Sequence, residues 1–118
     1  MAYVDGFVIP IAKKQVASYR RIAKAAGKVW MDHGAIQYYE CVGDDMGTPM
    51  GVPFPKLTKL KKTDTVIFSW IVYRSKAHRD KVNAAVMNDK WMSKMLTMKM
   101  PFDVKRMSYA GFKTIVEL

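Results

Sequence analysis

The pattern of apolar residues along the chain is dominated by the stretch 65–73, TVIFSWIVY, which contains no charged residue. Its β-branched and aromatic content favours a strand over a helix. Successive side chains of a strand point to opposite faces of the sheet. The even-numbered positions are Val66, Phe68, Trp70 and Val72, and the odd-numbered ones are Ile67, Ser69, Ile71 and Tyr73. Both sets are largely apolar, which is typical of a central strand covered on both sides.

The rest of the pattern predicts one strand–helix–strand unit on each side of a long connection. From 13 to 33 the apolar residues follow the 3.6-residue period of a helix with a basic outer face, and Gly34 is its predicted stop. Ser75 and Asp89 are predicted N-caps of a helix from 76 and of a short helix through 95. The other predicted strands cover 3–11, 35–43 and 105–112, with a short terminal one at 114–118.

This order of elements predicts an α+β fold, a ferredoxin-like βαββαβ antiparallel sheet with its helices on one face. The first and third strands are expected at the centre. The other face would leave apolar side chains in water, so we expect a homodimer with face-to-face sheets, a dimeric α/β barrel. The connection 44–64 is long for a plain loop and is expected to contain a helical turn near 55–60 or to serve as a flap.

Composition narrows the class of protein. A chain of 118 residues is expected to form one domain, 1–118. The lone Cys41 excludes an internal disulfide, and neither a signal peptide nor a membrane span is predicted, so we expect a cytoplasmic protein. Twenty Lys and Arg against ten Asp and Glu give a net charge of +10, which favours anionic partners without requiring them.

Several segments resemble the YbaA-like bacterial proteins, a family of unknown function in the dimeric α/β-barrel superfamily. The matching segments are YVDGFV, HGAIQYYEC with GDD, FSW, SKAHRD, and MPFDVKRM with AGF, and they span nearly the whole chain in order. The loop 46–62 departs from the family pattern, as do Val104 and Ala110, where relatives tend to have glycine. The resemblance implies a fold and a dimer. Through the wider superfamily, it also suggests binding or cofactor-independent oxidation of a small molecule.

Two histidines without clustered carboxylates indicate no metal site, and no cofactor is predicted. His78 is a candidate catalytic acid or base, or alternatively a core histidine satisfied by one hydrogen bond. Asp5 and Glu40 lie in predicted strands and need partners, either as ion pairs or as an acid–base pair. The expected partners are Arg79, Lys105 and Arg106. The residues predicted to bind a ligand are Trp70, Phe68, Tyr109 and Arg79.

The favoured function is therefore binding, and by extension cofactor-independent oxidation, of a small apolar or aromatic molecule; whether the chain is an enzyme stays open. The alternative is an interaction protein whose basic surface meets an acidic partner or nucleic acid. Nucleic acid is the less favoured partner, since no recognised motif is present, and binding would be weak and salt-sensitive. The charge is concentrated in two places: Lys13, Lys14, Arg21, Lys24 and Lys28, and Lys56, Lys59, Lys61 and Lys62.

Overall fold

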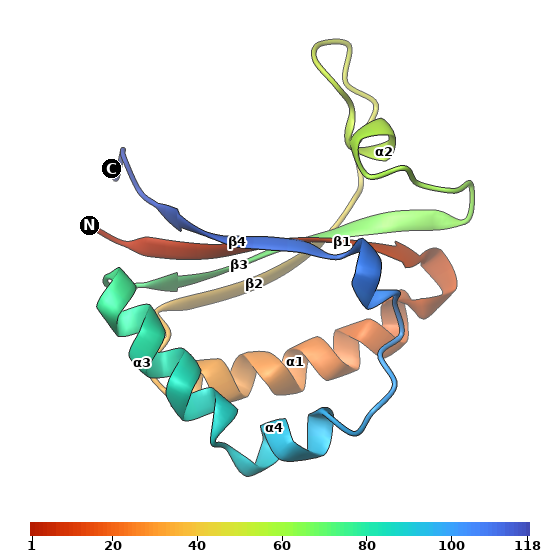
Figure 1. Cartoon of the computed structure of the whole chain (residues 1–118). Coiled ribbons are helices and arrows are strands. Elements are labelled where there is room, and N and C mark those ends of the chain that lie inside the picture. Colours follow the sequence, from red (N-terminus) through yellow and green to blue (C-terminus); the bar gives the residue numbers. More distant parts are fainter.

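A computed structural model describes residues 1–118 as an α+β fold built on one four-stranded antiparallel sheet (Figure 1). The strands are β1 (Tyr3–Ala12), β2 (Gln37–Val42), β3 (Asp64–Tyr73) and β4 (Ser108–Lys113). Their order in the sheet is β2-β3-β1-β4, which places the first and third strands at the centre as the sequence predicts. The sheet is open, and β2 and β4 are its edges.

The longer helices all lie on one side of the sheet, as Figure 1 shows. They are α1 (Val16–Asp32), α3 (Lys76–Met87) and α4 (Lys90–Met95). Ser75 caps α3 by accepting a hydrogen bond from the His78 backbone N–H, and Asp89 caps α4 by accepting one from the Trp91 N–H. Both predicted caps are confirmed. Gly34 follows α1 with a φ of 112°, a conformation that glycine adopts without strain.

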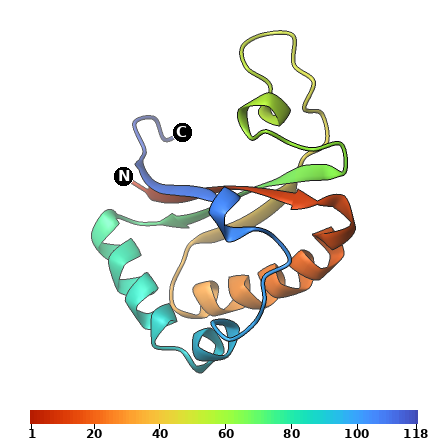
Figure 2. The ribbon, with the colours of Figure 1, turned by 45° about the vertical axis from the view of Figure 1, so that its right-hand side comes forward.

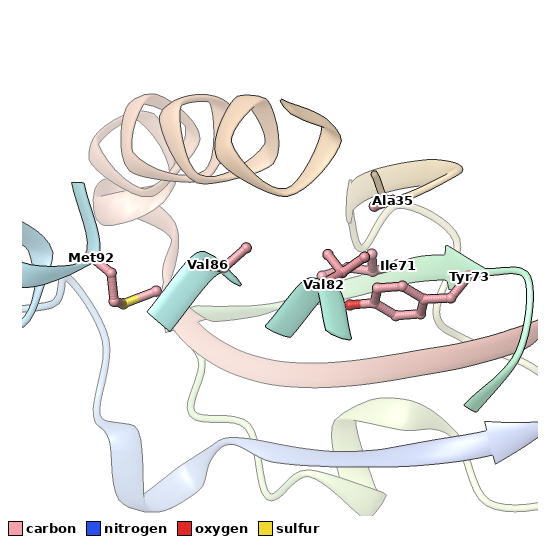
Figure 3. Packing of buried hydrophobic residues seen from close by; sticks show 6 residues of the cluster. All are labelled: Ala35, Ile71, Tyr73, Val82, Val86 and Met92. Carbon is pink, nitrogen blue, oxygen red and sulfur yellow. The ribbon is translucent and has the colours of Figure 1, made fainter. Parts of the chain in front are cut away.

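The core lies between this helical layer and the sheet, in two clusters. One cluster lies between the sheet and the helices α3 and α4. It is centred on Tyr73 and Val86, which are completely buried (Figure 3). The other cluster lies between the sheet and α1 and is centred on Ile11 and Tyr19. The odd-numbered residues of β3 face the helices, and the even-numbered ones face away. The sequence predicted these two sets correctly.

Several predicted boundaries need correction. Residues 13–15 form a separate 3-10 turn before α1. The helical turn expected in the long connection is confirmed as α2 (Phe54–Leu57), which begins one residue earlier and ends three residues earlier than predicted. The last predicted strand begins too early, because Val104–Arg106 forms a 3-10 turn capped by Asp103. The predicted terminal strand at 114–118 is wrong. Thr114 donates its hydroxyl to the Ala2 carbonyl instead, and the tail makes no further ladder.

Apart from Asp64 at the start of β3, which is paired with Arg106, the sheet face turned away from α1 and α3 carries no charged side chain along its four strands. We call this set the open face. Its members are Val4, Gly6, Val8, Pro10, Gln37, Tyr39, Cys41, Val66, Phe68, Trp70, Val72, Ser108, Ala110 and Phe112. Tyr39, Phe68 and Phe112 on this face are exposed to solvent. Within a single subunit, therefore, a broad apolar surface of the sheet stays uncovered.

The connection between β2 and β3 stands away from the sheet on the open-face side (Figures 1 and 2). It carries α2, and the Phe54 ring meets the Phe68 ring edge-on with centroids 6.2 Å apart. This contact covers one end of the open face and leaves the rest exposed. The structure also has no helix with the length and apolarity needed to cross a membrane.

Candidate functional site

His78 lies in the first turn of α3, buried against the sheet. Its Nδ1 accepts a hydrogen bond of 3.0 Å from the Arg74 backbone N–H, and its Nε2 faces Gly34. Nδ1 is therefore unprotonated and the proton resides on Nε2. Burial, followed by the charge of Arg74, lowers the pKa of His78 below its ordinary value of 6.5. The ring is neutral at pH 7 and contacts Tyr73 edge-on, with centroids 6.0 Å apart.

This environment gives stability a dependence on pH. The unfolded chain binds a proton at His78 near pH 6.5, whereas the folded chain resists protonation until lower pH. The stability that neutral His78 contributes to the folded chain is fully present above pH 6.5. It is lost as pH falls toward the pKa of His78 in the folded chain. We expect His78→Asn, which keeps an acceptor for the Arg74 N–H, to reduce the fall in urea midpoint between pH 7 and pH 5. His33→Asn is the control, and an undiminished fall in the His78 variant would contradict this assignment.

Arg79, the next residue of α3, is anchored in the helix–sheet layer. Its Nη1 donates to the Asp5 carboxylate at 2.8 Å, and its Nε donates to Asp80 at 2.8 Å. The guanidinium carbon also lies 4.9 Å from the centroid of the Tyr3 ring. Burial disfavours the charge of Arg79, but the two carboxylates outweigh that effect and raise its pKa. The predicted partnership of Asp5 with Arg79 is confirmed.

Phe68 and Trp70 lie on the open face in a continuous row of aromatic rings. Trp70 stacks on Tyr39 with centroids 5.1 Å apart and planes 7° from parallel. Phe68 meets Trp70 edge-on at 5.7 Å, and Phe54 of α2 continues the row. Such a row presents a broad π surface to whatever covers the sheet.

The sheet separates the residues that the sequence nominated. Tyr109 of β4 stacks on Phe7 at 5.6 Å on the helix side, with 67% of its surface exposed. His78 and Arg79 also lie on the helix side, whereas Phe68 and Trp70 occupy the open face. The five residues therefore do not converge on one pocket. Phe68 and Trp70 remain together as one candidate surface.

A hollow of about 400 Å³ adjoins that surface on the open side of the sheet. Val8 and Ser108 contribute from the strands, and Leu57 and Thr58 come from α2 and the residue after it. Val8 is the register partner of Phe68 on β3, so the hollow borders the aromatic row. Its rim also carries two cations, Lys59 and Arg106. Its volume lies within the range found for small-molecule pockets.

A larger groove of about 530 Å³, which the sequence did not reveal, lies between α1 and the edge strand β2. Glu40 lies in its lining and accepts hydrogen bonds from the hydroxyls of Tyr19, at 2.8 Å, and Tyr38, at 2.6 Å. Burial and then the nearby Glu40 charge raise the pKa of both tyrosines, so both stay protonated donors. The expected cationic partners of Glu40 are wrong, since two phenols take that role.

Two further ion pairs involve residues outside the lining of this groove. Arg106 donates to Asp64 at 3.1 Å, and His33 lies 2.8 Å from Asp89, where it joins the end of α1 to the start of α4. Lys105 takes part in no ion pair. No three side chains of His, Cys, Asp or Glu lie close enough together to hold a metal ion. Cys41 is a half-buried thiol on the open face.

These features define a small α+β protein with a one-sided helical layer and an uncovered aromatic sheet face. Comparison with known proteins then gives its family. The chain matches the model of a protein family of unknown function, DUF1428, over residues 2–104, and it belongs to this family. The resemblance to YbaA-like proteins is thus confirmed.

The individual relatives support the same assignment. The chain is 38% identical over 117 residues to the uncharacterized protein YbaA of Escherichia coli K12, covering 99% of both chains. It matches the YbaA protein of Shigella flexneri with the same identity and coverage. Among solved structures, the de novo designed protein Foldit4 aligns over 99% of this chain and all of its own, with a TM-score of 0.46 and 10% identity.

Proposed function

We propose that two copies of the ferredoxin-like subunit assemble through their open faces into a dimeric α/β barrel. Exposed Tyr39, Phe68 and Phe112 would leave a contiguous apolar surface in water in the monomer. The β2–β3 connection, which carries α2, and the tail after β4 both lie on this side of the sheet. Both can therefore contact a second copy that packs on the open face (Figure 1). The exposed apolar residues of this tail, Ile115 and Val116, would then be buried against the second copy.

The distribution of charge over the surface favours a second copy of this chain as the partner that covers the open face. Two molecules that each carry +10 repel one another wherever their lysines and arginines meet. The only charged strand residue on the open-face side of the sheet, Asp64, is paired with Arg106, so this face is the surface at which two such molecules can approach closely. An acidic protein or a nucleic acid would gain no electrostatic attraction from the open face. It would bind the basic surfaces instead.

We further propose that the enclosed aromatic layer binds a small apolar or aromatic molecule. The observation that carries this proposal is the row of aromatic rings from Tyr39, Trp70, Phe68 and Phe54 beside the 400 Å³ hollow. Flat rings stack favourably on such a row, and a second copy would exclude water from it. Oxidation of the bound molecule is a separate question, because neither His78 nor Arg79 lies on this face.

The test is a thermal-shift titration with a panel of flat aromatic molecules that begins with 1-naphthol. At a concentration ten times Kd, a bound molecule stabilises the fold by about 1.4 kcal/mol, which corresponds to a rise in Tm of roughly 6 °C. We expect this rise to disappear in Trp70→Leu. Trp91→Leu serves as the control, because Trp91 belongs to the helical layer and its loss should lower the starting Tm without removing the rise. A panel that shifts neither protein, or shifts both equally, would refute the proposal.

A second candidate function is supported by the cations along α1. Arg20, Lys24 and Lys28 line the groove beside β2, and no acidic side chain lies within 4.0 Å of any of them. Unpaired cations gathered along one groove favour an anionic partner over a purely solvating role. We propose that this surface contacts an acidic protein partner. Binding of nucleic acid to it should be weak and should fade as salt approaches physiological strength.

A further inference from the structure

The groove between α1 and β2 is long and narrow in a way that suits an extended chain. Its lining follows α1 from Val16 to Met31, and this length of helix spans about 22 Å. An extended peptide covers that distance with six or seven residues, at about 3.4 Å each. Gly27 keeps the groove narrow, because a Cβ there would lie 2.6 Å from the Tyr38 ring. Figure 1 shows α1 running along the sheet beside β2.

One wall of the groove is an unpaired strand edge. The Gly43 N–H donates to the Val66 carbonyl in register with the β2–β3 ladder. Hydrogen-bonded pairs alternate along an antiparallel ladder, so the backbone groups of 37, 39 and 41 also face β3. Those of Tyr38, Glu40 and Val42 consequently face outward, where β2 has no neighbour. They offer a template to which another strand can add.

The other wall carries three cations at a spacing that matches an added strand. Arg20, Lys24 and Lys28 are four residues apart, which is about 6 Å along a helix. Side chains on the same face of a strand repeat every second residue, at about 6.8 Å. Three acidic side chains at alternate positions can therefore each meet one cation. Glu40 does not compete for these cations, because its carboxylate is held by the hydroxyls of Tyr19 and Tyr38.

We infer that the groove binds an extended segment of a partner protein as a fifth strand beside β2, with acidic side chains at alternate positions facing Arg20, Lys24 and Lys28. The positions between them point to the open-face side of β2, beside Tyr39 and Cys41, and suit apolar residues. The partner motif is thus acidic–apolar alternation over about seven residues. This inference rests on the second candidate function and adds the conformation and sequence pattern of the partner.

The experiment is a fluorescence-anisotropy titration at low salt with a labelled peptide of four alternating Glu-Val pairs. A peptide of the same composition with its four Glu residues in one block is the matched control. The alternating peptide should bind at least about tenfold more tightly, because only it satisfies three cations and the strand edge together. Methylation of alternate peptide nitrogens on the β2-facing side should abolish this preference.

Two protein variants test the location. Lys24→Glu should weaken binding of the alternating peptide by about tenfold or more, because it reverses the central cation of the row. Lys90→Glu makes the same charge change at an exposed position of α4 and should change Kd by less than about twofold. Equal effects of the two variants would overturn the inference. So would displacement of the peptide by an oligo-dT strand with higher affinity than the peptide itself, which would make nucleic acid the preferred occupant.

The outcomes separate this inference from the function on which it rests. If both peptides bind equally and both depend on Lys24, the basic groove does meet acidic partners but does not take them as an added strand. If neither peptide binds at low salt, the inference and the acidic-partner function both fail. The aromatic-layer proposal is unaffected by either result, because it depends on the aromatic row that includes Trp70 and Phe68 and not on the cations of α1.

Discussion

Phe68→Arg is expected to abolish the proposed dimer, so that this variant sediments as a monomer in sedimentation velocity at micromolar concentration. Phe68 lies on the open face and is 44% exposed in the subunit, so the folded monomer can accommodate the longer side chain. In a two-fold dimer the substitution buries two unpaired guanidinium groups, at a cost of several kcal/mol per charge. We expect the dimer Kd to rise by at least about a thousandfold, equivalent to about 4 kcal/mol.

Leu96→Arg is the matched control for this experiment. It introduces the same charge at a residue that is 71% exposed, just after α4 on the helix side of the sheet. This variant should remain a dimer, and both variants should keep the circular dichroism of the parent. A wild-type chain that sediments as a monomer would refute the assembly outright. Dimers that persist in Phe68→Arg would move the interface to another surface.

The second large effect concerns stability. Arg79→Met should lower the free energy of unfolding by about 3 kcal/mol in urea at pH 7, because it leaves the carboxylate of Asp5 buried without a cationic partner. The Asp5 side chain is 8% exposed and that of Arg79 is 20% exposed. Because the pair is not fully buried, we expect a loss of stability near the lower end of the range of about 3–5 kcal/mol for broken buried ion pairs. Removal of the stacking contact with Tyr3 adds a smaller amount.

Two further variants separate the ion pair from other effects of the substitution. Asp5→Asn combined with Arg79→Met removes both charges and should recover part of the lost stability. Arg74→Met removes a cation from an exposed position that forms no salt bridge, and it should change stability by less than about 0.5 kcal/mol. If Arg79→Met were no more destabilising than Arg74→Met, the Asp5 carboxylate would have to be satisfied by another group.

Local sequence signals predicted most of the fold. The two apolar faces of β3 located the centre of the sheet, and Ser75 and Asp89 marked the starts of α3 and α4, because capping depends on residues only two or three positions away. The 3-10 turn at Val104–Arg106 was missed. Its basic and branched residues also suit a strand, and the cap from Asp103 decides between the two.

The candidate sites were harder to predict because they depend on which face of the sheet the helices cover. Alternation along β3 separates Trp70 from Tyr73, but it does not tell which of them meets α3. The sequence therefore nominates both Trp70 and His78 for a site, although they lie on opposite sides of the sheet. The pairing of Glu40 with Tyr19 links residues from an edge strand and a helix, and no local pattern signals it. Only the assembled fold brings these side chains into contact.

The central position of β1 has a consequence for synthesis of the chain. β1 is made first, yet both of its neighbours, β3 and β4, belong to the second half of the sequence. During synthesis β1 has no partner strand until β3 and β4 have been made. Its Val, Ile and Phe side chains therefore stay exposed in the nascent N-terminal half. Long-range pairing of this kind slows folding and raises the demand for chaperones. Truncated chains that end before β3 should therefore aggregate, whereas chains that contain all four strands should stay in solution.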